Sequence, residues 1–350
     1  MKKLIRGIAW IFGILILLFV LFLIVATLTD YKPPAKVELY VSDHPDTLDM
    51  YDTLNLMTWN IGYCGLGKDM DFFYDGGSQV RTSKKHTINN LKAIRNFLIL
   101  NDTMDAFFLQ EVDVSSKRTY HIHEVDTLRK YLPQYKVFLA LNYKVFYVPV
   151  PVAHPMGGVK SGVVLISRHE PLRVDRMDYP GQYDWPIRLF MLDRCFLVAR
   201  FPLKDRTQLV LIDTHNSAFD NGELKKNEMT FLKDFILREQ QKGNKVVVGG
   251  DWNQNPPGFQ DKAFNNKSGY KRFVLNQIPE NYLPAGWTWA YDRTHMTNRS
   301  NLTSFDPGKT PTTLIDFFLL SPGVKCLFTQ GIDLGFEHSD HNPVRIRICL

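Results

Sequence analysis

Acidic, amide and imidazole side chains stand directly beside short apolar runs at several separate places in the sequence. A rigid scaffold that ends its strands in such groups presents them to one shared site, where acid–base chemistry becomes available. The residues are Asn60 after LNLMTW, Glu111 after AFFLQ, His215 after QLVLID, Asp251 and Asn253 after KVVVGG, and the pair Asp340 and His341 before the last apolar run.

Two short motifs strengthen this interpretation. Taken singly, Asn and Asp often end strands as turn formers, and one histidine is commonly an ordinary polar group. However, two glycines directly precede Asp251, and glycine lets the backbone approach a ligand closely. Ser339-Asp340-His341 likewise couples an acid to an imidazole beside a strand. The combination therefore predicts a functional site, although none of the residues would do so alone.

The elements that must position these groups are mostly short strands. Two longer segments, 84–100 and 223–242, have apolar residues at the three-to-four spacing of helices. Strands outnumber helices, which favours two stacked sheets with helices outside over a doubly wound parallel sheet. The predicted strands are 54–59, 106–110, 136–141, 162–167, 195–201, 208–213, 245–250, 316–320 and 344–348.

Composition excludes several classes of protein. With 45% hydrophobic and 22% charged residues, the chain of 350 residues is too apolar to be disordered. The formal net charge is +6, but Lys2, Lys3 and Arg6 precede the first acidic residue, Asp30, and supply half of it. The remaining chain has nearly equal numbers of acidic and basic residues, which argues against a protein that binds long nucleic acid by charge alone. The four scattered cysteines predict no metal motif and no particular disulfide.

The N-terminal segment has the character of a membrane span. Residues 8–28 carry no charge and are long enough to cross a bilayer as a helix, which predicts contact with a lipid bilayer. The basic residues lie within 1–7, so the positive-inside rule places this end in the cytoplasm and the rest of the chain outside it. A cleaved signal peptide is the alternative, although the apolar run exceeds the usual length of such a region.

The remaining chain divides into two parts. Residues 29–53 are polar and contain three prolines, as expected of a tether or an edge segment. Residues 54–350 hold all the predicted strands and all the candidate site residues, and form the predicted catalytic domain.

Six motifs in this domain resemble the signature blocks of the endonuclease/exonuclease/phosphatase superfamily, the metal-dependent DNase I-like hydrolases, and they occur in that family's order. The resemblance implies an α/β fold, a four-layer α/β/β/α sandwich of two packed mixed sheets. It also implies hydrolysis of phosphoesters by in-line attack of water. The motifs are TWNIG (58–62), LQEVD (109–113), DTHNS (213–217), GGDWNQNP (249–256), LIDFFLLS (314–321) and HSDHNPV (338–344).

The resemblance also assigns a metal site. Glu111, with Asn60 beside it, would hold Mg²⁺, for which Mn²⁺ could substitute. Asp340 would coordinate or steer the metal side. Mg²⁺ takes few protein oxygens and keeps several waters, which leaves room for a phosphate.

Five residues receive catalytic roles by the same resemblance. Asp251 would orient or deprotonate the attacking water, and Asn253 would fix that carboxylate and a phosphate oxygen. His341 would be a second base or a stabiliser of phosphate charge, with Asp316 accepting its far ring N–H. His215 would stabilise the transition state or protonate the leaving oxygen. The choice between Asp251 and His341 as the base stays open.

The sequence departs from the family pattern in one respect. Family members often carry a basic residue before the acid of the fifth block, whereas residues 312–315 here are uncharged. Lys117 and Arg118, soon after Glu111, could supply phosphate contacts, although a basic patch there fits a solvated loop equally well.

Membership of this family does not select the substrate. A membrane-tethered site flanked by the aromatic and Pro-containing segments 142–158, 183–190 and 284–291 could meet lipid head groups. A tethered nuclease, with bases stacked on the same aromatic rings, is the alternative. The third hypothesis is a non-catalytic phosphate-binding module, which the complete set of acids and imidazoles disfavours. No protein partner is predicted.

Overall fold

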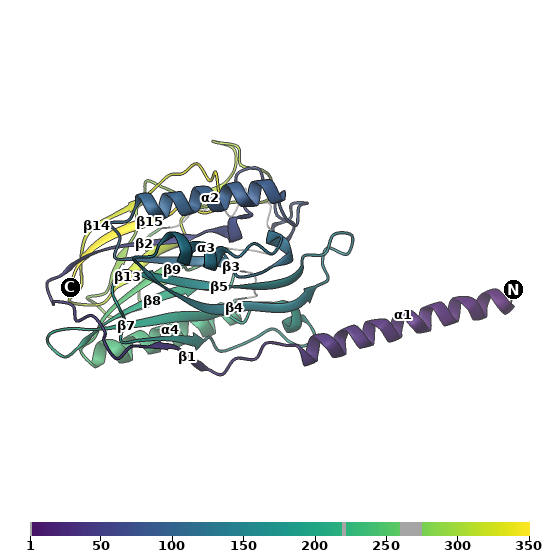
Figure 1. Cartoon of the computed structure of the whole chain (residues 1–350), viewed down its shortest axis with the longest axis horizontal. Helices are drawn as coiled ribbons and strands as arrows, with labels where there is room; N and C mark the ends of the chain where they lie inside the picture. Colours follow the sequence, from purple (N-terminus) through teal and green to yellow (C-terminus); the bar gives the residue numbers. More distant parts are fainter. Residues whose placement is uncertain (1, 219–221, 260–274) are drawn as a thin grey trace.

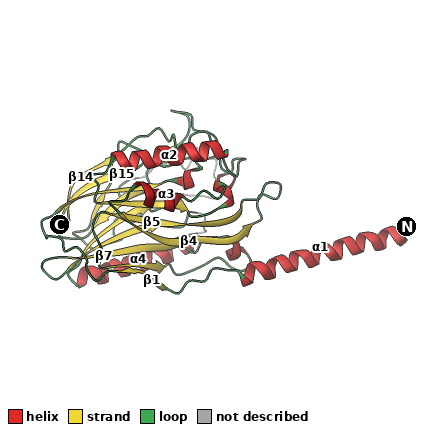
Figure 2. Ribbon diagram, viewed as in Figure 1, coloured by secondary structure: helices red, strands yellow, loops and turns green. Residues whose placement is uncertain are grey.

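The computed structural model describes residues 2–218, 222–259 and 275–350, so Met1 of the predicted cytoplasmic end lies outside it. Its centre is a pair of β-sheets (Figures 1 and 2). One sheet has the order β1 (Lys36–Val41), β6 (Arg173–Asp178), β7 (Cys195–Pro202), β8 (Gln208–His215), β9 (Lys245–Asp251), β13 (Asp316–Leu320) and β10 (Thr288–Ala290). The other has the order β14 (Lys325–Gly331), β15 (Val344–Cys349), β2 (Thr53–Asn60), β3 (Ala106–Asp113), β5 (Gly157–Ser167) and β4 (Lys136–Val148).

Both sheets are mixed. The pairs β2–β3 and β8–β9 are parallel, and the other neighbours within these two sheets are antiparallel. The inner faces share one apolar core, in which Phe108 of β3 meets Phe318 of β13 edge to face. Alternate residues of each strand point into this core, as the period of two in a strand requires.

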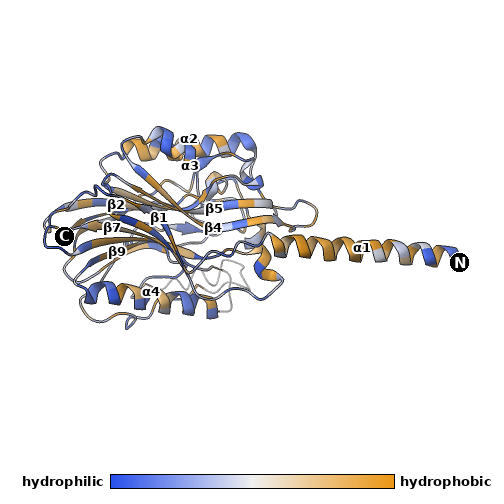
Figure 3. Ribbon diagram, turned by 60° about the horizontal axis from the view of Figure 1, so that its bottom comes forward, coloured by the Kyte–Doolittle hydropathy of each residue, from blue (hydrophilic) through white to orange (hydrophobic). Residues whose placement is uncertain are grey.

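Helices cover the two outer faces (Figure 3). α2 (Lys84–Leu100) and α3 (Glu124–Tyr131) pack on the sheet that holds β2 and β3, through side chains such as Ile94 and Leu128. α4 (Glu223–Gln241) packs on the other sheet through Leu232 and Ile236. The predicted four-layer α/β/β/α sandwich is therefore confirmed.

The sequence patterns located the central strands and missed strands at or next to the sheet edges, together with a separate short ribbon. All nine predicted strands and both predicted helices are present. The strands not predicted are β1, β6, β10, β14 and the short ribbon of β11 (Asn298–Arg299) and β12 (Thr312–Thr313). β14 is largely exposed, so it lacks the alternation of apolar residues by which a strand is recognised. β1 lies within residues 29–53, and it forms an edge strand by pairing with β6.

α1 (Lys2–Leu28) projects away from the sandwich and is apolar along most of its length (Figures 1 and 3). Among the described residues it is the one helix long and apolar enough to cross a membrane. An anchor and a signal sequence share these properties.

Candidate active site

Three neighbouring strands of one sheet end side by side in functional side chains. His215 of β8 is in register with Asp251 of β9, and Asp251 is in register with Asp316 of β13. Because β8 and β9 are parallel and β13 runs the other way, the ends of the first two strands meet the start of the third. The ends of these three strands thus bring an imidazole and two carboxylates together.

The glycine before Asp251 is required by the backbone. Gly250 has a φ of +147°, and a Cβ placed on it would lie 2.0 Å from the carbonyl oxygen of Thr214 on β8. A side chain at this position would therefore push β8 and β9 apart. Asn253, two residues after Asp251, has a φ of +49°, and its N–H donates to Oδ1 of Asp251 over 2.9 Å. The turn thus fixes the carboxylate from its own backbone.

The second sheet supplies Asn60 at the end of β2 and Glu111 in β3. Glu111 sits at a β-bulge with a φ of +56°, an uncommon conformation for a residue with a side chain. Asn60 joins the two sheets, because its Nδ2 donates to Oε1 of Glu111 over 3.2 Å and to Oδ2 of Asp251 over 3.0 Å. Its Oδ1 accepts from the N–H of Gly62.

His341 is hydrogen-bonded on both ring nitrogens. Its Nδ1 lies 2.8 Å from Oδ2 of Asp316, which is fully buried. Its Nε2 lies 3.0 Å from the side-chain amide of Asn298. An amide can present either its N–H or its oxygen to a ring nitrogen, so Asn298 can accompany both protonation states of His341.

Burial and neighbouring charges set the protonation of this cluster. Burial alone would lower the pKa of His341, but Asp316, Asp340 and Asp251 outweigh it and raise the pKa to about 10. Burial and the charge of Asp316 raise the pKa of Asp251 to about 6. Burial also raises the pKa of Glu111, and Asp340 adds to that rise. The charged imidazole of His341 therefore faces three carboxylates, those of Asp316, Asp340 and Asp251.

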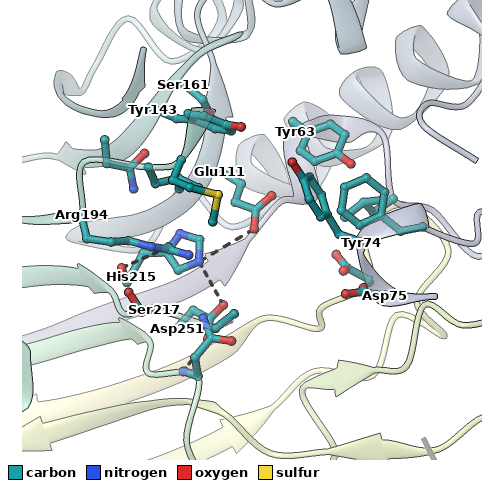
Figure 4. A pocket seen from close by; sticks show the side chains of 18 of the residues that line it. Tyr63, Tyr74, Asp75, Glu111, Tyr143, Ser161, Arg194, His215, Ser217 and Asp251 are labelled. Carbon is teal, nitrogen blue, oxygen red and sulfur yellow. Dashed lines mark hydrogen bonds and ion pairs between the residues drawn. The ribbon is translucent and has the colours of Figure 1, made fainter. Parts of the chain in front are cut away.

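His215 faces both sheets (Figure 4). Its Nε2 is 3.6 Å from Oδ2 of Asp251 and 3.8 Å from Oε1 of Glu111. Burial lowers its pKa well below the ordinary value, and Arg194 lowers it further. His215 is thus a neutral imidazole beside two acids.

A cavity of about 310 Å³ opens in front of these groups. Its polar wall is the cluster described above, and its apolar wall includes Tyr63, Phe72, Tyr143 and Met156. Asn60 and Asp316 lie behind the lining and act on it through their hydrogen bonds. The predicted residues that line the cavity are Glu111, Arg118, His215, Asp251, Asn253, Asp340 and His341.

Comparison with known proteins agrees with this geometry. Residues 57–341, well over half of the chain, match the Endonuclease/Exonuclease/phosphatase family. The chain belongs to this family. A search of curated proteins found no match.

Solved structures of the family's fold are similar over most of the chain. An endonuclease/exonuclease/phosphatase from Beutenbergia cavernae is 16% identical with a TM-score of 0.56, covering 85% of this chain and 72% of that one. A family protein from Bacteroides vulgatus is 17% identical with a TM-score of 0.52, covering 85% and 98%. D. rerio TDP2, solved with a single-strand DNA product, is 16% identical with a TM-score of 0.52, covering 85% and 99%. At such low identity the likeness concerns the fold.

The two basic residues suggested for phosphate contact have different surroundings. Arg118 is buried, forms an ion pair with Asp113 over 2.8 Å and stacks on the ring of Tyr63 at 3.6 Å, while still lining the cavity. Lys117 does not line the cavity, and its Nζ lies 5.9 Å from the ring centre of Tyr147. Of the two, only Arg118 is at the predicted site.

Asp340 is held beside the cluster by two neighbours, Asn301 and Gly62. Its Oδ2 accepts a hydrogen bond from Nδ2 of Asn301 over 2.6 Å. Its Oδ1 lies close enough to Gly62 that a Cβ there would come within 2.8 Å of it. Asp340 is thus placed beside the end of β2, where Asn60 is found.

Sequence reasoning missed most of the cavity lining, including three residues that contact or neighbour the predicted ones. Asn298 and Asn301 contact His341 and Asp340, and Arg194 lines the wall beside His215. Asn298 and Asn301 lie in or beside a two-residue strand, and Arg194 stands just before β7. The one available signal was the basic residue missing before Asp316, since Arg194 and Arg118 bring positive charge to the cavity from elsewhere.

The donor set fits a hard cation. Glu111, Asp251 and Asp340 bring three carboxylates to one cavity, and neutral amide or backbone donors hold all three. The side chain of Glu111 is 25% exposed, so an ion could reach it. A second group, Asp251, Asp316 and His341, also offers ligand atoms within 4.8 Å of one another. However, the hydrogen bond between Asp316 and His341 already uses one potential ligand atom of each. Glu111 is therefore the better centre for an ion.

Proposed function

We propose that this protein is a Mg²⁺-dependent phosphodiester hydrolase. The observation that carries the proposal is the convergence of the Asp316–His341 pair, Asp251 and Glu111, from two sheets, on one cavity. Family membership supports a phosphoester hydrolase of this kind. The complete set of acids and imidazoles argues against a phosphate-binding module without catalytic activity.

Glu111, with Asn60 and Asp340, would hold Mg²⁺, and Mn²⁺ could replace it. When bound, the ion supplies positive charge for a phosphate and its leaving oxygen. Asn60 presents its Nδ2 to Glu111 in the structure, so it would have to turn its amide to offer the oxygen. Glu111 is therefore the ligand on which the proposal depends most.

The protein's own residues supply the positioning and the proton transfer. Asp251 orients the attacking water and is the candidate to take its proton, with its carboxylate fixed by Asn253 and Asn60. His341, which the neighbouring carboxylates keep protonated, stabilises phosphate charge, and Asp316 sets its orientation. His215 donates a hydrogen bond to the phosphate or to the leaving oxygen.

We propose that residues 8–28 are an uncleaved single-pass anchor that binds the lipid bilayer. The N-terminus would lie in the cytoplasm and the catalytic domain outside it, because the basic residues lie at the N-terminal end. Full-length protein should stay with membranes through a carbonate wash, and alkaline phosphatase fused after residue 60 should be active. A soluble mature form starting near Asp30 would show a cleaved signal instead.

For the substrate we propose a lipid head-group phosphodiester. The cavity has an apolar wall, and the segments that form it contact the end of α1. A nucleic-acid substrate is the second candidate, favoured by the fold shared with D. rerio TDP2, whose structure holds a single-strand DNA product.

A panel assay tests both the reaction and the substrate. Full-length protein in detergent would be given Mg²⁺ with sphingomyelin, plasmid DNA, RNA and a bis-aryl phosphodiester. We expect turnover that EDTA abolishes and that added Mg²⁺ or Mn²⁺ restores. Full activity after exhaustive chelation would contradict the proposed dependence on Mg²⁺. The absence of turnover on every substrate would favour a phosphate-binding module without catalytic activity.

A further inference from the structure

The end of α1 is packed against the catalytic domain. The ring of Phe22 stacks on Phe190 with centroids 5.7 Å apart and meets Tyr147 of β4 edge-on at 6.2 Å. Phe190 closes a short 3₁₀ helix, η4 (Ile187–Phe190). Ala26, one turn further along α1, is buried. Two segments of the domain, the end of β4 and η4, thus hold the last turns of the apolar helix.

Polar contacts continue this attachment where the chain leaves α1. Nε1 of Trp185 donates to Oγ1 of Thr27 over 3.3 Å, and Arg188 pairs with Asp30 at 3.8 Å. Nζ of Lys144 lies 5.1 Å from the ring centre of Tyr31. With contacts on both sides of the junction, the domain has a defined orientation relative to α1, and therefore to any membrane that α1 crosses.

The same two segments carry exposed apolar side chains. Val152, in the turn between β4 and β5, is 89% exposed, and Trp185 and Ile187 are 55% and 56% exposed. Exposed apolar groups on segments that contact a membrane-spanning helix are unfavourable in water and favourable at a bilayer interface, where Trp is enriched. We define the interfacial patch as Phe146, Val150, Val152, Trp185 and Ile187.

The fold places this patch at the end from which α1 emerges. In Figure 1 the turn between β4 and β5 projects at that end, whereas β14 lies near the opposite end. β14 also carries exposed apolar residues, including Leu327 at 52%, but α1 does not approach it. The chain thus provides its own matched control for exposed apolar surface away from the membrane.

The wall of the cavity is built from the segments that bear the patch. Tyr183, two residues before Trp185, lines the cavity, as do Met191, just after η4, and Met156, four residues after Val152. Some residues of these segments therefore line the cavity, and others nearby in the sequence carry the exposed apolar side chains.

We propose that the interfacial patch inserts into the non-cytoplasmic leaflet and holds the cavity at the level of the lipid head groups. An amphiphilic phosphodiester would then enter from the leaflet with its acyl chains still in the bilayer. This inference rests on the proposed hydrolase activity and anchor, and adds the surface that docks and the route of the substrate. The partner is the bilayer itself, because α1 delivers the patch to it.

The test uses the full chain in proteoliposomes and two substrates. The double variant Val152→Asp/Ile187→Asp should lose at least tenfold in the hydrolysis rate of a phosphodiester lipid in the bilayer. It should keep the rate on a water-soluble bis-aryl phosphodiester, since neither residue touches the catalytic cluster. Leu327→Asp should keep both rates. An unchanged rate of the double variant on the lipid would overturn the inference.

A direct measurement of depth separates this inference from the proposed function. Cys64 and Cys195 are buried, so a background with Cys326→Ser and Cys349→Ser leaves a cysteine at position 152 as the site for a polarity-sensitive label. The label on Val152→Cys should report an apolar environment and be quenched by nitroxide lipids, whereas the label on Leu327→Cys should report water. A label at position 152 that reports water would contradict insertion of the interfacial patch, whatever the activity. A buried label without hydrolysis of the soluble substrate upholds the patch and overturns the hydrolase.

Discussion

The ion pair between Arg200 and Glu239 and the cluster around His341 are both largely buried, yet their carboxylates hold protons very differently. Arg200 donates two hydrogen bonds to Glu239 over 2.8 and 3.0 Å, and Lys242 and Asn244 donate to the same carboxylate. Burial alone would raise the pKa of Glu239, but these donors lower it to about 2. This carboxylate is saturated and stays charged.

The cluster around His341 is balanced less completely. Burial raises the pKa of Asp251 to about 6, and Asp316 has its Oδ1 buried without a hydrogen-bond partner in the described chain. Natural proteins tolerate such costs where a site needs them. Glu239 has four side-chain hydrogen bonds of its own and serves stability. Asp251 shares the amide of Asn60 with Glu111, which leaves its carboxylate available for chemistry.

Removing the imidazole should have the largest effect on activity. His341→Ala should lower kcat by about 10² or more, the range typical of acid–base groups, with little change in KM. Tm should fall, because the buried carboxylate of Asp316 loses the imidazole that balances it. Steady-state kinetics on the best substrate of the panel, with thermal unfolding as the control, would measure this. Wild-type turnover by this variant would remove His341 from the site.

A smaller effect is expected from neutralising the proposed metal ligand. Glu111→Gln keeps the shape of the side chain and removes one formal charge, so the Mg²⁺ concentration for half-maximal activity should rise about tenfold. A titration of activity against Mg²⁺ measures the change. An unchanged requirement would place the ion elsewhere.

The saturated pair should respond in stability and not in activity. Glu239→Gln should lower the free energy of unfolding by about 1–3 kcal/mol at pH 7, because hydrogen bonds to a charged group are lost, and leave kcat unchanged. The folded pKa lies below the ordinary 4.5, so the contribution of Glu239 is complete above that pH and declines as pH falls towards 2. The difference between variant and wild type should shrink over the same window. A constant difference would show that packing, and not charge, is responsible.

The sequence predicted those features that depend on local pattern. Asp251 follows two glycines and a run of β-branched residues, so its place at a strand end could be read directly. Asn298 and Asn301 reach the site only because β11 and its neighbouring loop fold back against His341, and no periodicity marks such loops. β1 was uncertain for the same reason, since an edge strand is supported by β6 and not by its own pattern.

Asp316 is expected to act on the reaction through His341, and a double-mutant cycle measures this coupling. Asp316→Asn alone should lose part of the effect of His341→Ala, because the imidazole stays but its tautomer and orientation are less constrained. The double variant should be no slower than His341→Ala, since the asparagine has no imidazole left to misplace. If the two losses in kcat instead multiply, the residues act independently and the account of this site is wrong.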